Sequence, residues 1–280
     1  MAPFAAETDD SGPSSRGFLP VIPKIKGCKH LLRLDVSSIT TPTNPSAPAS
    51  RTIPDQPSPI VAREGWEIIA SVVLLAGVIA WFGVWKFGAL GWIAFVPGAL
   101  LVCFCLWFFR NPQRQIPADI HALVAPADGV VIAVEPATLP EELASELGIS
   151  TTEPMQRVVI FLNVFNVHVN RVPFAGTVLG VVRKAGGFAH AGRPEAQHNQ
   201  RCTLAMKSGD GRLLAISQVT GLIARRIVCR AEAGQSYEKG QRFGLIRFGS
   251  RTDVYIPARA LVVVKAGDKT MGGTTVIARW

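Results

Sequence analysis

The fold class is indicated first by residues 157–187, RVVIFLNVFNVHVNRVPFAGTVLGVVRKAGG. The stretch is built of short runs rich in Val and Ile that alternate in part with polar residues and are broken by Pro and Gly, which is typical of β-strands. Runs of the same kind surround it at 123–136, 201–231, 242–257 and 260–280. Residues 111–280 are therefore predicted to form a mainly β (α+β) domain of the barrel-sandwich kind.

Two local signals add detail to this β domain. Gly209-Asp210-Gly211 has the composition of a tight hairpin turn between two strands. PEELASEL at 140–147 predicts one helix, with Gly148 as its C-terminal cap.

Residues 62–110 contain two long apolar runs, IIASVVLLAGVIAWFGVW at 68–85 and FGALGWIAFVPGALLVCFCLWFF at 87–109. About 20 apolar residues are needed for a helix to cross a bilayer. The runs predict a membrane hairpin of helices of about 18 and 22 residues that turns at Lys86-Phe87-Gly88, with Pro97-Gly98 as a kink or re-entrant point. Arg63 before the pair and Arg110 and Arg114 after it place both ends on the cytoplasmic side of the inner membrane.

Residues 1–61 read as a disordered tail, because residues 1–60 hold 10 of the 20 prolines among many Ser, Thr and Ala. The chain carries a net charge of +9, and residues 181–280 hold 17 basic and 6 acidic residues. This asymmetry fits a polyanionic partner, either an anionic bilayer or a nucleic acid. The five cysteines form no C-x-x-C pair, so neither a zinc site nor a disulfide framework is predicted.

Considered singly, the polar residues of the β domain admit two readings. Asp128, in Pro-Ala-Asp-Gly, is an ordinary turn residue or a site carboxylate. Asn166, His168 and Asn170 would share one face of an alternating strand, which is either the solvent side or the lining of a site. Ser250, after Gly249, marks a break between two strand-like runs and by itself is only a turn.

Taken in order, four stretches resemble the short bacterial and archaeal form of phosphatidylserine decarboxylase. They are WFFRNPQR at 107–114, VAPADGVVIAV at 124–134, FLNVFNVHVNRVPFAGTV at 161–178 and GLIRFGSRTDVYIP at 244–257. The resemblance spans about 62–280 and includes the apolar hairpin. It implies a precursor that cleaves itself at Gly249-Ser250 into a β chain of 1–249 and an α chain of 250–280.

The resemblance also implies the chemistry of that cleavage. The Ser250 hydroxyl attacks the Gly249 carbonyl to give an ester, and loss of the Cα proton of residue 250 expels Gly249 as a carboxylate. The dehydroalanine that remains hydrolyses to a pyruvoyl group and ammonia, so neither a metal nor pyridoxal phosphate is expected. The pyruvoyl ketone forms a Schiff base with phosphatidylserine and accepts the electrons released when CO2 leaves.

Residue roles follow from the same motifs. Asp128 matches the aspartate implicated in self-cleavage, and His168 matches a histidine assigned to proton transfer or to orienting the substrate carboxylate. Asn166, Asn170 and Arg171 are candidates for binding the substrate.

Arg171 stands where longer members of the family keep a second histidine, and a permanently charged arginine is a poor base. The base for self-cleavage therefore stays open, with His190 and His198 as possible replacements. Arg201, at the end of a segment resembling the family's Asn-Glu-Arg, is a further candidate for binding a phosphate or carboxylate.

Two other classes of function compete with this reading. A membrane-tethered lipoyl-like adaptor would share the Pro-Ala-Asp-Gly turn and the strands but would stay one uncut chain. A nucleic-acid-binding protein would use the basic last third, but the apolar hairpin and the lack of an RNP-like motif count against it. The expected partners are phosphatidylserine, an anionic membrane surface and the chain's own α and β fragments, with a homo-oligomer of these left open.

Overall fold

The computed structural model describes residues 52–54, 56–223, 226–247 and 249–280, so residues 1–51 of the predicted tail lie outside the described residues. The helical elements are η1 (Arg63–Gly65), α1 (Trp66–Phe87), η2 (Gly88–Ala94), α2 (Phe95–Phe108), α3 (Glu141–Leu147) and η3 (Pro194–His198). The strands of the first half are β1 (Thr52–Pro54), β2 (Gln115–Pro117), β3 (Ala122–Val124), β4 (Gly129–Ala137), β5 (Met155–Leu162), β6 (Val169–Arg171) and β7 (Gly176–Lys184). The strands of the second half are β8 (Arg201–Ser208), β9 (Leu213–Val219), β10 (Ile227–Cys229), β11 (Ser236–Tyr237), β12 (Arg242–Ile246), β13 (Ser250–Pro257), β14 (Leu261–Val262), β15 (Lys269–Thr270) and β16 (Val276–Arg279).

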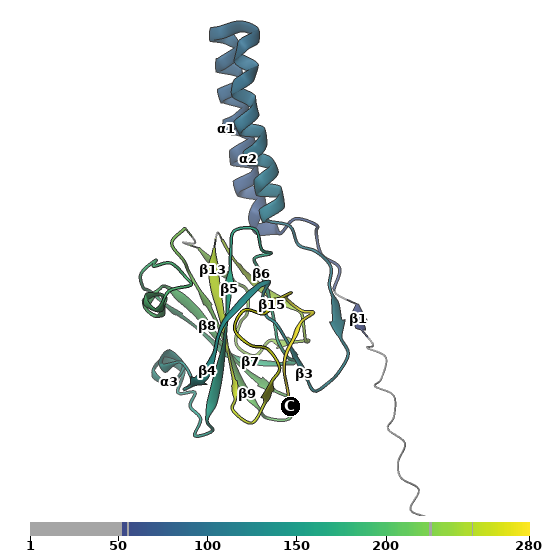
Figure 1. Cartoon of the computed structure of the whole chain (residues 1–280), viewed down its shortest axis with the longest axis vertical. Helices are drawn as coiled ribbons and strands as arrows, with labels where there is room; N and C mark the ends of the chain where they lie inside the picture. Colours follow the sequence, from purple (N-terminus) through teal and green to yellow (C-terminus); the bar gives the residue numbers. More distant parts are fainter. Residues whose placement is uncertain (1–51, 55, 224–225, 248) are drawn as a thin grey trace, which may run out of the picture. The chain divides into compact units, whose positions relative to one another are not determined.

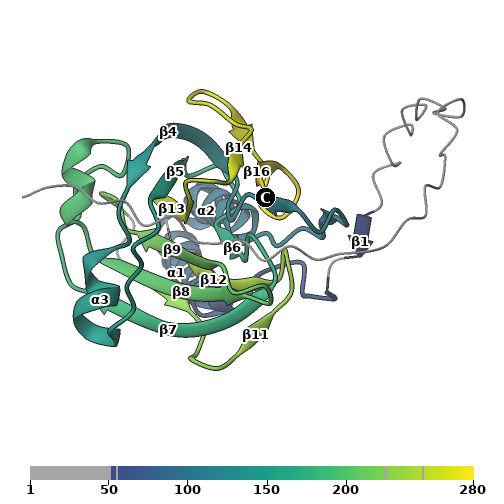
Figure 2. The same ribbon diagram turned by 90° about the horizontal axis from the view of Figure 1, so that it is seen from below.

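The main sheet confirms the predicted mainly β fold. Its eight strands run in the order β11-β7-β8-β9-β13-β5-β4-β15, and all neighbouring strands are antiparallel. The sheet curls into a half-barrel (Figure 2). β13 lies in the middle of the order, and all eight of its residues are buried.

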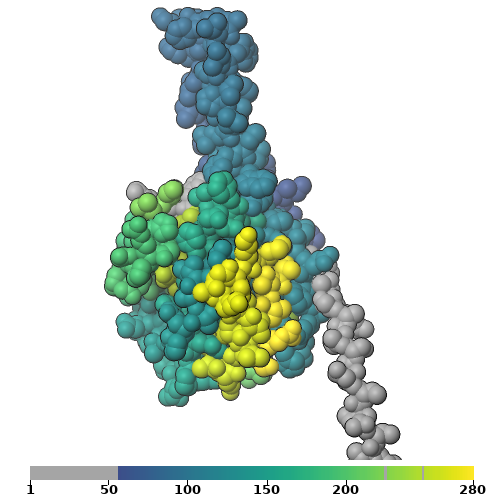
Figure 3. All heavy atoms as spheres, in the orientation of Figure 1, coloured from purple at the N-terminus to yellow at the C-terminus, as the bar shows by residue number. Residues whose placement is uncertain are grey.

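Two three-stranded sheets, β10-β12-β6 and β14-β16-β3, accompany the main sheet. Buried aliphatic side chains pack in separate clusters, one around Ile160, Val254 and Ile277 and another around Leu204, Ile216 and Phe243. The C-terminal strands, yellow in Figure 3, lie over one face of the β domain. β1, at the end of the segment predicted as a tail, pairs with β2.

The local predictions for the β domain are met. Helix α3 ends at Gly148, which adopts a left-handed conformation with a φ of +65°. The Gly-Asp-Gly turn joins β8 to β9, which pair antiparallel from Arg201↔Val219 to Lys207↔Leu213.

The apolar segment folds as a hairpin, with α1 and α2 side by side (Figure 1). Its helix lengths differ from the prediction of about 18 and 22 residues: α1 has 22 residues and α2 has 14. The reason is the turn, because Gly88 takes a φ of +59° and a seven-residue 3-10 helix begins there. Pro97 lies in the first turn of α2, where its missing N–H is not needed, so it starts the helix rather than kinking it.

The two helices approach closely along a seam of small residues. A Cβ on Gly91 would lie 2.1 Å from the carbonyl carbon of Gly83, and a Cβ on Gly98 would lie 2.5 Å from the Cβ of Ala76. Small-residue seams of this kind are typical of helices that pack in membranes. The segment Arg63–Phe108 is apolar and long enough to cross or anchor in a membrane.

Candidate active site

Ser250 is the first residue of β13 and pairs with Leu162 on β5. Its side chain is fully buried, and among the described residues its Oγ has no hydrogen-bond partner. Leaving a buried hydroxyl unpaired costs about 1–3 kcal/mol, so such a group calls for an explanation. A nucleophile held ready for its own chain is one explanation consistent with the motif.

Gly249, just before Ser250, has a φ of +68°, in the left-handed region that favours glycine. Its carbonyl group lies directly against Gly221, where an added Cβ would be 2.5 Å from the Gly249 oxygen. The position of the Gly249 carbonyl therefore depends on a second glycine in the loop after β9. Gly221 was not identified from the sequence, because nothing local distinguishes it from other loop glycines.

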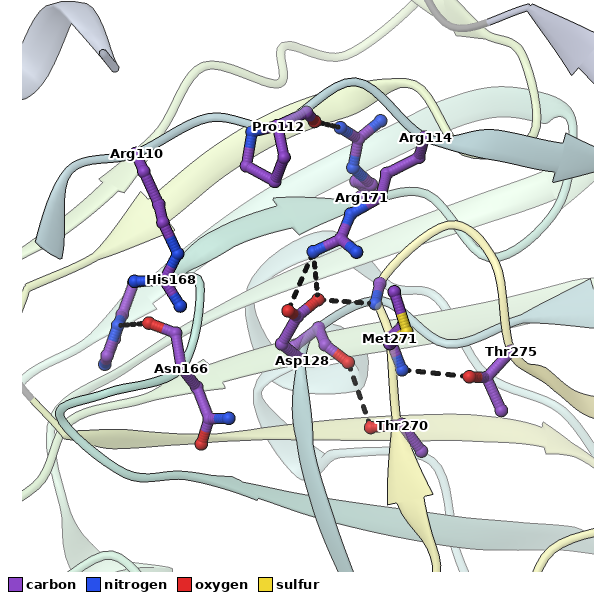
Figure 4. Close-up of polar contacts among 12 residues, drawn as sticks. Arg110, Pro112, Arg114, Asp128, Asn166, His168, Arg171, Thr270, Met271 and Thr275 are labelled. Atoms are coloured by element: carbon purple, nitrogen blue, oxygen red, sulfur yellow. Dashed lines mark hydrogen bonds and ion pairs between the residues drawn. The ribbon is translucent and has the colours of Figure 1, made fainter. Parts of the chain in front are cut away.

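His168 lies against the same loop. Its Nε2 accepts the N–H of Gly249 at 3.1 Å, and its Nδ1 lies 2.9 Å from the carbonyl oxygen of Asn166 (Figure 4). These two contacts place the ring proton on Nδ1. Burial lowers the pKa of His168 to about 4, with a smaller lowering contribution from Arg110 and an opposing one from the Asn166 carbonyl. The ring is therefore neutral at pH 7, which allows Nε2 to accept the Gly249 N–H.

Asp128 lies just before β4 and is held by three hydrogen bonds. Arg114 donates to both carboxylate oxygens, at 2.8 and 3.0 Å, and the Gly272 N–H donates at 2.7 Å (Figure 4). The side chains of Arg114 and Asp128 are only 10% and 15% exposed. Arg114 was noted in the sequence for its charge near the membrane, and its pairing with Asp128 was not foreseen.

The predicted polar face of Asn166, His168 and Asn170 is only partly right. Strand β6 begins at Val169, and Asn166 lies in a turn, because its Oδ1 accepts the Asn163 N–H at 2.9 Å. Only Asn170 is part of β6. Its fully buried amide donates to Thr252 Oγ1 at 3.3 Å and accepts from Gln218 at 2.7 Å.

Arg171 binds backbone carbonyl groups of two loops. Its guanidinium donates to the carbonyl oxygens of Gly240 at 2.9 Å and Pro112 at 3.1 Å (Figure 4). These bonds tie the segment after α2 to the loop before β12. Where longer relatives keep a histidine, this chain thus has a cation that binds backbone carbonyls.

Arg201 is not brought to Ser250. Arg201 pairs with Val219, and Val219 pairs with Arg251, so these three side chains share one face of the sheet. Ser250, one residue before Arg251, points to the opposite face. Arg201 and His198 line a different pocket, and the prediction that Arg201 binds a phosphate or carboxylate stays a prediction.

An apolar pocket of about 220 Å³ opens beside Gly249. Its lining includes His190, whose ring stacks on Phe161 with centroids 5.5 Å apart, and the exposed Leu222 and Ile223. Of the two alternative histidines, His190 therefore lies near the scissile glycine and His198 does not. In the described part of the chain, no group of three or more His, Cys, Asp or Glu side chains is placed to hold a metal ion.

Comparison with known proteins identifies the family. The family model described as phosphatidylserine decarboxylase matches residues 101–278. The phosphatidylserine decarboxylase proenzyme of Magnetococcus marinus is 42% identical over 226 residues, covering 79% of this chain and 96% of that protein. The proenzyme of Rickettsia akari is 41% identical, covering 78% of this chain and 90% of that protein. The proenzyme of Gluconacetobacter diazotrophicus is 48% identical, covering 67% of this chain and 81% of that protein. The chain therefore belongs to the phosphatidylserine decarboxylase family.

Proposed function

We propose that this chain is a self-processing proenzyme that converts phosphatidylserine to phosphatidylethanolamine and CO2. The observation that carries the proposal is the Gly249-Ser250 junction. It joins a left-handed glycine, whose carbonyl packs against Gly221, to a buried serine hydroxyl that has no hydrogen-bond partner among the described residues. The chain belongs to a family whose relatives are named proenzymes, which supports a cleavage reaction at this junction.

In the uncut chain, the Ser250 Oγ attacks the carbonyl carbon of Gly249 and the peptide C–N bond breaks. His168 accepts the Gly249 N–H, which restrains the residue that carries the reacting carbonyl. Asp128, fixed by Arg114 and Gly272, keeps the proposed role in self-cleavage that its motif implies. The base that removes the Ser250 proton is not assigned to Arg171, whose guanidinium binds two carbonyl groups.

A pyruvoyl group at position 250 would supply the ketone that binds the substrate amine and accepts the electrons left when CO2 departs. Residue 250 is fully buried beside a neutral histidine, which suits such a group because water is excluded. Once Gly249 becomes a chain end, it can move away with its N–H, and His168 Nε2 can then transfer or hold a proton at the substrate. Asn166 is proposed to help orient that histidine, and Asn170 to hold Thr252 and Gln218 in place, rather than to bind substrate directly.

We propose that the hairpin lies in the inner membrane and that the β domain is on its cytoplasmic side. Arg63 and Arg110 flank the apolar helices, and basic residues at helix ends favour the cytoplasmic face. Phosphatidylserine would then be presented from the bilayer. The working enzyme would consist of the fragments 1–249 and 250–280, and a larger oligomer of these is left open.

The decisive experiment compares the wild-type chain with Ser250→Ala. The wild-type 30.0 kDa chain should be converted to two fragments. Mass spectrometry should show the 250–280 fragment with a pyruvoyl N-terminus in place of serine. Ser250→Ala should remain one chain and release no CO2 from phosphatidylserine. Turnover by the uncut variant would refute the pyruvoyl mechanism, and an intact Ser250 throughout the active wild-type sample would refute self-processing.

A further inference from the structure

The base of the apolar hairpin is a well-packed unit, which we call the hairpin foot and define as Arg63–Gly65 together with Phe108–Arg110. The chain closes on itself there, because the Ala62 N–H donates to the Phe109 carbonyl at 2.8 Å. Phe108 and Phe109 are both fully buried. They cluster with Val167, Val169 and Leu245 of the β domain, so the foot is embedded in the domain rather than merely joined to it.

Phe108 lies directly on His168. The two ring centroids are 4.4 Å apart with an angle of 35° between the planes. Both side chains have no exposed surface. A flat ring against the imidazole fixes the plane of His168 and keeps water away from it. The same exclusion of water is the main reason why the pKa of His168 is low, and Arg110, the nearby cation, adds to the effect.

The hairpin foot also holds the chain on each side of the hydrogen bond between His168 and Gly249. On the histidine side, Arg110 donates to the carbonyl oxygen of Phe165 at 2.6 Å, in the turn that leads to His168. On the glycine side, Arg247 donates to the carbonyl oxygen of Glu64 at 2.7 Å. The donor and the acceptor of that hydrogen bond are therefore each anchored to the end of the membrane hairpin.

We propose that the hairpin foot is a working part of the self-processing site, with Phe108 as the positioning residue for His168. This inference rests on the function proposed above and adds a role for the WFFR part of the 107–114 motif. The hairpin then has two tasks, which are to hold the chain at the bilayer and to complete the surroundings of His168. A chain whose foot has come away from the domain would leave His168 free to rotate and open to water.

The full-length chain is synthesised in the presence of phospholipid vesicles, and Phe108→Leu is compared with Phe243→Leu. Both residues are fully buried aromatics, but Phe108 makes the ring contact to His168, whereas Phe243 packs in the separate cluster around Leu204 and Ile216. The rate of self-cleavage is measured at pH of about 7.5 and about 5.5. A histidine with the ordinary pKa of about 6.5 is only about one-tenth neutral at the lower pH, whereas one with a pKa of about 4 is almost wholly neutral.

Wild type and Phe243→Leu should therefore lose less than about twofold in rate between the two pH values. Phe108→Leu should lose about tenfold, because water reaches the uncovered imidazole and its pKa moves back toward the ordinary value. If Phe108→Leu does not fold, Phe108→Met tests the same point, since methionine fills the space without a flat face. An unchanged pH profile in the folded Phe108 variant, or the same shift in Phe243→Leu, would overturn the inference. A wild-type chain that never cleaves would instead refute the proposed function, and this inference with it.

Discussion

Replacing Gly221 with alanine should slow self-cleavage by displacing the scissile carbonyl. The added Cβ would lie 2.5 Å from the Gly249 oxygen and 3.3 Å from its carbonyl carbon. The backbone at Gly221 is outside the left-handed region, so alanine is sterically permitted there and the substitution tests packing rather than backbone strain. Ordinary contact begins at 3.4 Å, so the carbonyl has to move by about 1 Å.

A misplacement of about 1 Å in a reacting group lowers a rate by roughly a hundredfold. The expected result is therefore a Gly221→Ala chain that folds and inserts like wild type but is cleaved about 100 times more slowly. The assay follows the uncut chain on gels during cell-free synthesis with vesicles and identifies the 250–280 fragment by mass spectrometry. The same chains are tested for membrane association, so that failed insertion is not mistaken for slow chemistry.

Gly209→Ala is the matched control. This glycine also lies in a turn outside the left-handed region, and an added Cβ there meets no atom within 4 Å. It should be cleaved at the wild-type rate. The reasoning is refuted if Gly221→Ala is cleaved as fast as wild type, or if Gly209→Ala is slowed as much as Gly221→Ala.

Two further predictions concern the groups around the junction, and both use the Ser250→Ala background to keep the chain uncut. Arg114→Gln should lower the free energy of unfolding by about 3 kcal/mol, because the largely buried Asp128 carboxylate loses its cation and keeps only the Gly272 N–H. Adding Asp128→Asn should restore part of that loss, and a double variant no more stable than Arg114→Gln would contradict the argument. The pKa of His168 is lower in the folded chain, about 4, than the ordinary value of 6.5, so the unfolded chain binds the extra proton between these values. The free energy of unfolding should therefore fall by about 3 kcal/mol in total as pH drops from about 6.5 to about 4. His168→Gln should lose this part of the pH dependence when unfolding is measured by denaturant titration. Equal pH dependence in both chains would count against a buried neutral histidine.

Most of the fold follows from local sequence. The Val- and Ile-rich runs with Gly and Pro between them predict the strands, and the helix before Gly148 is placed to within one residue. The hairpin follows from the length of its apolar runs. Its helix lengths do not, because they depend on Gly88 and on the contact between Gly83 and Gly91, which is set by the packing of one helix on the other.

Local sequence predicts only some of the residues of the candidate site. The motifs predict Ser250, His168 and Asp128 as site residues, since each stands in a distinctive stretch. They also suggested Arg201, because polar residues near a motif look equivalent in a sequence. The sheet register separates them: Arg201 falls in line with Arg251, whose side chain points away from the Ser250 face.

The pairings inside the site could not be predicted, because they join residues far apart in the chain. The hydrogen bond from Gly249 to His168 spans 81 positions and depends on how β6 pairs with β12, a ladder whose register shifts between Arg242 and Gly244. A shift of one residue in such a ladder would turn every following side chain to the other face. The motif residues therefore suggest which groups could react, whereas the fold decides that His168 binds Gly249 and that Arg171 binds the carbonyl groups of Gly240 and Pro112.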